Sequence, residues 1–110
     1  MRKEPTRKRI NEVLEALGDS YALKVIDYEW CIHRDLGSGY DIEISGLDNR
    51  RKKLNIAVYV WRIRGRLETV EMIRNIRSIW QLRQVLNKIE WHYREDVYPL
   101  PLLYEWGTSA

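Results

Sequence analysis

The sequence predicts an α+β fold: an N-terminal helix, an antiparallel β-meander of three or four strands, a C-terminal helix and an extended tail rich in proline and aromatic residues. Apolar residues recur at helical spacing near both ends of residues 1–96, whereas they alternate with polar residues in the middle. A chain of 110 residues is also about the size of one domain. We therefore expect a single domain over residues 1–96 and a tail over 97–110.

The first helix is expected from about residue 5 to residue 17. Pro5 suits a first helical turn, and Gly18 is a typical residue at a helix end. Four apolar residues share one face of this helix: Ile10, Val13, Leu14 and Leu17. Basic side chains near the helix start oppose the helix dipole, which favours a functional role for Arg7, Lys8 and Arg9.

Three segments in the middle of the chain have the composition of β-strands. The first runs from Tyr21 to Arg34 and changes its apolar parity near Val25, which predicts a bulge or bend there. Turn residues 35–39 precede a second strand at 40–45, in which apolar and polar residues alternate. A turn at 46–49 and a basic run at 50–53 precede the third strand. Its core face is predicted to hold Leu54, Ile56, Val58 and Val60.

Residues 67–76 are compatible with either a helix or a strand, because their apolar residues recur every three positions. Ser78 and Gln81 form a capping-box pattern that starts a new helix at residue 79. This leaves residues 67–73 as a separate element, which we expect to be a fourth strand. The second helix then runs to about residue 93, with an apolar face of Ile79, Leu82, Val85, Leu86 and Ile89.

The tail is expected to be extended, because Pro99 and Pro101 prevent a helix. Its high apolar content predicts that residues 98–106 are ordered, either against their own chain or against a second copy in a homodimer. The predicted core consists of Ile10, Val13, Leu14, Leu17, Ile42, Ile44, Leu54, Ile56, Val58, Val60, Leu82, Val85, Leu86 and Ile89.

The composition argues against membrane and secreted classes. No stretch approaches the roughly 20 consecutive apolar residues of a membrane-spanning helix, and the first residues lack the apolar core of a signal peptide. Cys31 is the only cysteine, which fits a reducing compartment. We expect a cytoplasmic protein without a membrane partner.

No residue pattern points to catalysis, a metal or a cofactor. Cys31 and His33 share a strand face as a nucleophile and a base would, but no orienting acid or oxyanion loop accompanies them. With the distant His92 they are too few for a zinc site. Phosphate-binding loops, nucleophile elbows and dinucleotide fingerprints do not occur. We expect a protein that is not an enzyme and needs no cofactor.

Four carboxylates occur in two pairs with two-residue spacing and are expected on the outer sheet face: Asp27, Glu29, Asp41 and Glu43. Such a cluster has the chemistry to hold magnesium. Restriction-endonuclease-like nucleases combine an acid on the second strand with Glu-X-Lys on the third, but residues 55–61 contain neither a carboxylate nor a lysine. We therefore interpret these acids as solvated groups beside a basic strand.

Charge is segregated along the chain beneath the formal net charge of +3. Residues 18–48 hold two basic and seven acidic side chains, whereas residues 49–94 hold twelve basic and three acidic ones. The two halves either neutralise each other across neighbouring strands or present a basic surface to an anionic partner. For the second case, the predicted binding residues are Arg50, Arg51, Lys52, Lys53, Arg62, Arg64 and Arg66, with Tyr59 and Trp61 as stacking platforms.

Nucleic acid is the favoured partner, although the motifs of double-stranded-RNA-binding domains and RNA-recognition motifs are absent. The alternative is a protein–protein interaction module that binds an acidic protein surface through tryptophan, tyrosine and arginine. Small phage or mobile-element inhibitors and regulators of larger complexes, including RNA-guided nucleases, share this size and build. That similarity is one of scale, without a matching motif.

Overall fold

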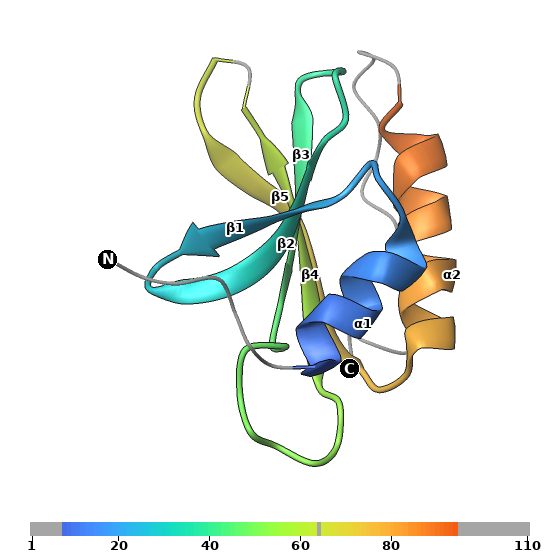
Figure 1. Cartoon of the computed structure of the whole chain (residues 1–110). Helices are drawn as coiled ribbons and strands as arrows, with labels where there is room; N and C mark the ends of the chain where they lie inside the picture. The colour runs from blue at the N-terminus through green and yellow to red at the C-terminus, as the bar shows by residue number, and fades with distance from the viewer. Residues whose placement is uncertain (1–7, 64, 95–110) are drawn as a thin grey trace.

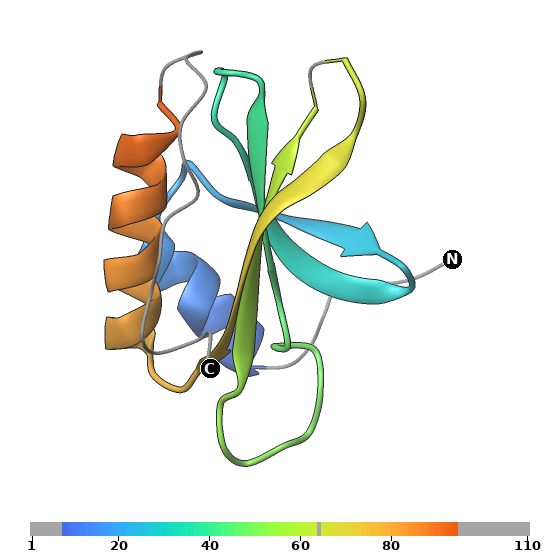
Figure 2. The ribbon, with the colours of Figure 1, turned by 180° about the vertical axis from the view of Figure 1, so that it is seen from behind.

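The computed structural model describes residues 8–63 and 65–94 and confirms the predicted α+β class. Two helices cover one face of a five-stranded antiparallel sheet whose strands lie in chain order (Figures 1 and 2). The elements are α1 (Lys8–Leu17), β1 (Ala22–Ile26), β2 (Glu29–Asp35), β3 (Tyr40–Ser45), β4 (Ile56–Arg62), β5 (Glu68–Ile76) and α2 (Ile79–His92). None of the described helices is long and apolar enough to cross a membrane.

The sheet has one strand more than the upper prediction, because residues 21–34 form a hairpin and not one bent strand. Asp27 and Tyr28 have positive φ angles of 51° and 66° and make the two-residue turn between β1 and β2. Val25 therefore lies opposite Trp30 on the same sheet face, which explains the change of parity. Asp-Gly is a usual sequence for such a turn, and Asp27-Tyr28 lacks the glycine that signals it.

Residues 68–76 form a strand, as predicted for 67–73, and the strand extends to Ile76. Ile76 pairs with Ile56 and Ile73 pairs with Val58, so β5 has one extra residue between these two pairs. Asn75 lies in this irregularity with a φ of 61°. A bulge of this kind returns residues three apart to the same sheet face, so Ile73 and Ile76 are both buried. The bulge thus accounts for the three-residue spacing between Ile73 and Ile76.

The end of α1 and the start of α2 are as predicted, whereas the predicted start of the first helix at about residue 5 lies outside the described residues. At the end of α1, Gly18 has a φ of 92° and its N–H donates to the carbonyl of Leu14 at 3.1 Å. At the start of α2, the backbone N–H of Gln81 donates to the Ser78 hydroxyl at 3.0 Å. The Gln81 side-chain oxygen accepts from the backbone N–H of Arg77 at 2.8 Å, which completes the cap.

The core lies between the two helices and the sheet face that they cover. The predicted core residues are buried except for Leu14 and Leu54, which are half-buried and pack against the rest. The prediction missed further residues of the core cluster, which come from β2, from the start of β3, from the irregular β5 and from segments outside the helices and strands: Tyr21, Ile32, Tyr40, Leu47, Ile73, Ile76 and Tyr93. The tail over 97–110 lies outside the described residues, so its order and the homodimer remain predictions.

Polar contacts at the C-terminal end of α2 attach this helix to the sheet. The Glu90 carboxylate accepts hydrogen bonds from Arg34 on β2, at 2.8 Å, and from the Tyr21 hydroxyl. Tyr93 follows α2 directly, and its hydroxyl donates to the buried Glu71 on β5. These contacts join the end of α2 to the residue before β1, to β2 and to β5. The opposite face of the helix is exposed to solvent.

Candidate nucleic-acid interface

The basic run lies in an ordered loop, residues 46–55, that joins β3 to β4 at the lower end of Figure 1. Leu47 is fully buried and Leu54 is half-buried, so apolar anchors hold both ends of the loop. The Asn49 side chain donates to the carbonyl of Gly46 at 2.8 Å and accepts from the N–H of Arg51 at 3.0 Å. An asparagine that bonds nearby backbone in this way fixes a turn, and residues 50–53 project into solvent.

Gly46 allows the two ends of this loop to approach each other closely. Its φ is 90°, which disfavours any residue with a Cβ atom. A Cβ at this position would also lie 2.5 Å from the carbonyl oxygen of Asn55. Glycine at residue 46 therefore lets the loop close without strain or a clash with Asn55.

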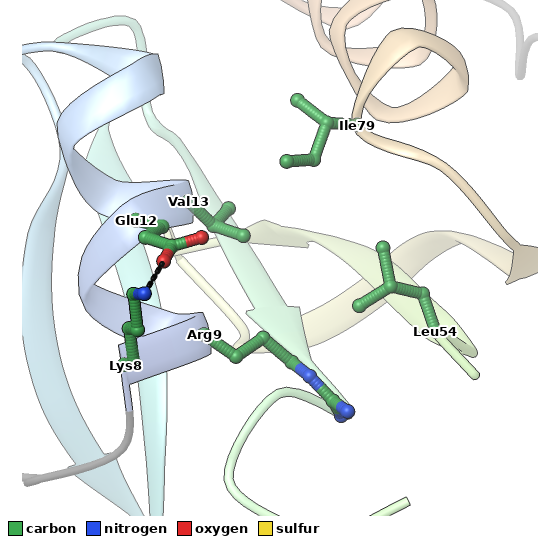
Figure 3. Close-up of a pocket in the computed structure, with 6 residues that line it drawn as sticks. All are labelled: Lys8, Arg9, Glu12, Val13, Leu54 and Ile79. Atoms are coloured by element: carbon green, nitrogen blue, oxygen red, sulfur yellow. Dashed lines mark ion pairs between the residues drawn. The ribbon is translucent and has the colours of Figure 1, made fainter. Parts of the chain in front are cut away.

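Arg9 on α1 connects the first helix to this loop. Its guanidinium donates to the Asn49 side-chain oxygen at 3.3 Å and to the carbonyl oxygen of Arg51. The Arg9 side chain lines a groove of about 350 Å³ that lies between α1, Leu54 in the loop before β4, and the start of α2 (Figure 3). Val13, Leu54 and Ile79 form the apolar walls of the groove.

We call the resulting surface the basic end; it consists of Lys8, Arg9, Arg50, Arg51, Lys52 and Lys53. Lys8 forms an exposed ion pair with Glu12 at 3.7 Å. Among the described residues, no carboxylate forms an ion pair with any of the four loop cations. The repulsion among the four loop cations is thus balanced by solvent and by the anchoring of the loop. These cations are available to an anionic partner.

The other predicted cations lie at the opposite end of β4. Arg62 ends that strand and forms an ion pair with Glu68, while Arg66 is exposed in the connection to β5. Arg64 lies outside the described residues. The seven residues of β4 span about 20 Å, so the structure does not bring Arg62 and Arg66 to the basic loop.

Tyr59 and Trp61 lie on the outer face of the sheet, which the helices leave uncovered. Tyr59 is opposite Glu43 and Trp61 is opposite Asp41 in the pairing of β3 with β4. The Trp61 indole N–H donates to the Glu43 carboxylate at 3.1 Å. These carboxylates repel phosphate, so the two rings are not placed as stacking platforms beside the basic end.

The described residues also bear on the catalytic hypotheses. Cys31 is buried, and burial together with nearby carboxylates raises the pKa of its thiol to about 12. A thiol with this pKa is protonated at neutral pH and is a poor nucleophile. His33 bonds to Asp41 instead, with Nε2 and Oδ2 2.9 Å apart. Within the described part of the chain, no group of three or more His, Cys, Asp and Glu side chains is placed to hold a metal ion.

Two exposed tryptophans on α2 form a further surface that we did not single out as a site from the sequence. Trp80 is 68% exposed and Trp91 is 66% exposed, and their separation of eleven residues places them on the same helix face. The Arg94 guanidinium lies 4.9 Å from the centre of the Trp91 ring. The packing of α2 against the sheet shows that both rings face solvent.

Comparison with known proteins finds no matching family model, and no curated protein or solved structure is significantly similar to the chain.

Proposed function

We propose that this chain is a non-catalytic protein that binds nucleic acid through its basic end. The observation that carries the proposal is the double hydrogen bond from Arg9 to the loop, which brings α1 and four exposed cations into one surface. Helix and loop are separated by about forty residues in the sequence, so the contact is a property of the fold. It holds the loop in place before any partner binds, which reduces the entropy lost on binding.

The basic end suits a phosphate backbone better than it suits bases. Lysine and arginine side chains neutralise phosphates irrespective of sequence, whereas base recognition requires side chains placed at base edges. Arg9 uses its guanidinium to hold the loop and acts as a positioning residue. We therefore propose binding with little sequence preference, in which Arg50, Arg51, Lys52, Lys53 and Lys8 contact phosphates.

A titration at two salt concentrations tests this function. Affinity is measured for mixed-sequence duplex and single-stranded DNA and RNA. Release of counterions from four to six phosphates predicts a loss of about a hundredfold to a thousandfold between ~50 and ~200 mM salt. Changing Arg50, Arg51, Lys52 and Lys53 to Ser should abolish most of this binding and flatten its salt dependence.

A charge-matched variant provides the control. It changes four exposed cations outside the basic end to Ser: Arg66, Arg74, Lys88 and Arg94. It lowers the net charge as much as the loop variant does and should retain most of the affinity. Equal losses in the two variants, or no binding by the unchanged protein at low salt, would contradict the proposal.

Binding of a protein partner is the second candidate, and the exposed tryptophans of α2 favour it. Tryptophan and arginine are enriched at the centres of protein interfaces, and α2 presents Trp80 and Trp91, with Arg94 just after the helix placed against the Trp91 ring. If the titration finds no nucleic-acid binding, the substitution of Trp80 and Trp91 by Ser tests this candidate. Loss of a protein that co-purifies from the native host would support it.

A further inference from the structure

The outer face of the sheet contains a hollow of about 360 Å³ that is separate from the basic end. Its floor is formed by side chains of β2, β3 and β4, among them His33, Asp41, Glu43 and Trp61. Ile26 and Asp27 from the β1–β2 hairpin border it on one side, and Ile63 and Leu67 from the β4–β5 connection border it on the other. These two hairpins project from the sheet on the side away from the helices (Figures 1 and 2). We call this site the outer-face hollow.

The hollow has an excess of negative charge. Asp27, Asp41 and Glu43 line it, and Lys24 is the only Lys or Arg among its described lining residues. Burial raises the pKa of Glu43, and the nearby charges of Asp27 and Glu29 raise it further. Carboxylates crowded in this way are stabilised by a cation that enters the site.

The carboxylates of the floor are held in place and retain capacity to accept hydrogen bonds. Glu43 accepts from Trp61, and Asp41 Oδ2 lies 2.9 Å from His33 Nε2. Asp41 Oδ1 is buried and has no hydrogen-bond partner among the described residues. A buried acceptor without a donor is unfavourable, so the Asp41 carboxylate retains an unmet capacity to accept a hydrogen bond.

The remaining walls are apolar and aromatic, which selects among cations. Trp61 lines the floor, and Ile63 and Leu67 border it with exposures of 42% and 65%. A bare metal ion gains nothing from such walls. A planar guanidinium stacks on an indole ring and donates several N–H groups to carboxylates, while its aliphatic stem covers apolar side chains.

We propose that the outer-face hollow binds a guanidinium group, carried by an arginine side chain of a protein partner. Charge complementarity supports this occupant, since the hollow is acidic, and its mixed walls match the two halves of an arginine side chain. Asp41 and Glu43 accept from the guanidinium, Trp61 contacts its face, and Ile63 and Leu67 contact its stem. This site is independent of the proposed nucleic-acid binding.

The test uses the full chain and three capped tripeptides, Gly-Arg-Gly, Gly-Lys-Gly and the neutral Gly-citrulline-Gly. The readout is the NMR signal of the Trp61 indole N–H, identified as the signal that is lost in Trp61→Phe. We expect the arginine peptide to shift this signal in a saturable way, the lysine peptide to bind more weakly and the citrulline peptide to have no effect. Equal effects of citrulline or lysine, or no shift up to the solubility limit of the arginine peptide, would overturn the proposal.

Matched variants assign the binding to the hollow. Glu43→Gln and Asp41→Asn each remove one charge and should weaken binding of the arginine peptide about tenfold or more, as loss of a charge-assisted hydrogen bond predicts. Asp19→Asn removes the same charge in the exposed turn after α1 and should leave the affinity unchanged. The Ser variant of residues 50–53 should also bind the peptide normally, which separates this result from that of the nucleic-acid titration. Equal weakening by Asp19→Asn would show an effect of net charge alone.

Discussion

The basic loop and the outer-face hollow are both built on β3 and β4, but they carry charge in different ways. The cations of residues 50–53 lie between two apolar anchors, and no described carboxylate pairs with them. Two carboxylates of the hollow lie on β3 itself, where Asp41 contacts His33 and Glu43 contacts Trp61. The charges of the loop can therefore be removed with little effect on the stability of the fold, whereas the charges of the hollow take part in contacts that belong to the fold.

Substitutions in the basic loop therefore report on binding, whereas substitutions in the outer-face hollow also report on folding. Exposed cations that contact no other side chain contribute little to stability, usually within about 0.5 kcal/mol. A partly buried carboxylate adds its desolvation cost to the fold until a cation compensates for it. The loop conformation depends instead on Gly46, Asn49 and Arg9, none of which belongs to the run at 50–53.

The largest expected effect in this comparison is that of Gly46→Ala. The substitution places a Cβ 2.5 Å from the carbonyl oxygen of Asn55 in a residue with a φ of 90°. Strained backbone of this kind costs on the order of 1–3 kcal/mol, and the contact with backbone adds to it. We expect the free energy of unfolding, measured by denaturant titration, to fall by about 3 kcal/mol, and the affinity for nucleic acid to fall with it.

Gly37→Ala is the matched control for this prediction. Gly37 has a φ of 75°, but a Cβ there would meet no atom within 4 Å. It should cost only the conformational strain, about 1 kcal/mol, and leave the loop at residues 46–55 intact. If both substitutions destabilise the protein equally, the close approach at Gly46 is not what holds the loop.

Most of the fold could be predicted from the sequence, because its signals are local. Capping by Ser78, termination at Gly18 and the alternation in residues 40–45 each act within a few residues and agree with the structure. The hairpin at Asp27-Tyr28 was missed because its backbone is stabilised by strand pairing, without the usual glycine. The extension of β5 was missed because a bulge at Asn75 changes the period of its apolar residues.

The candidate sites were less predictable, because they depend on contacts between distant segments. The sequence identified the basic run and the acids on the outer face, but it also joined Arg62 and Arg66 to the same surface. Only the register of the strands shows that these residues lie at the other end of β4. The contact from Arg9 to the loop has no sequence signal beyond the unfavourable placement of cations near the start of a helix.

Arg9→Ala should have an intermediate effect and tests whether the loop needs its connection to α1. Loss of the hydrogen bonds to Asn49 and Arg51 should destabilise the protein by about 1 kcal/mol. The amide of Arg51 should exchange its hydrogen faster, and the affinity for nucleic acid should fall severalfold. Hydrogen-exchange NMR and the titration described above measure these effects.

Arg83→Ala is the control for Arg9→Ala. Arg83 on α2 also donates to a backbone carbonyl, that of Ala16 at 2.7 Å. Its side chain is exposed, and it is distant from the loop in the sequence. Its loss removes the same charge without touching residues 46–55, so Arg51 should keep its exchange rate. Equal losses of affinity in the two variants would mean that net charge, and not the position of the loop, determines binding.

The smallest expected effect comes from Glu43→Gln, and its sign separates the hollow from the loop. Burial raises the pKa of Glu43 above the ordinary value of 4.5, so the folded protein keeps this proton to a higher pH than the unfolded chain does. Its contribution to stability is therefore fully present below pH 4.5 and is lost as the pH rises through the folded-state pKa.

Glutamine is neutral throughout and still offers an oxygen to the Trp61 indole N–H. We expect the variant to be more stable than the unchanged protein at pH 7, by less than about 1 kcal/mol, with the difference shrinking towards pH 4 in parallel denaturant titrations. The Ser variant of residues 50–53 should show no such pH-dependent gain, and a Glu43→Gln variant that is less stable at pH 7 would show that its carboxylate supports the fold.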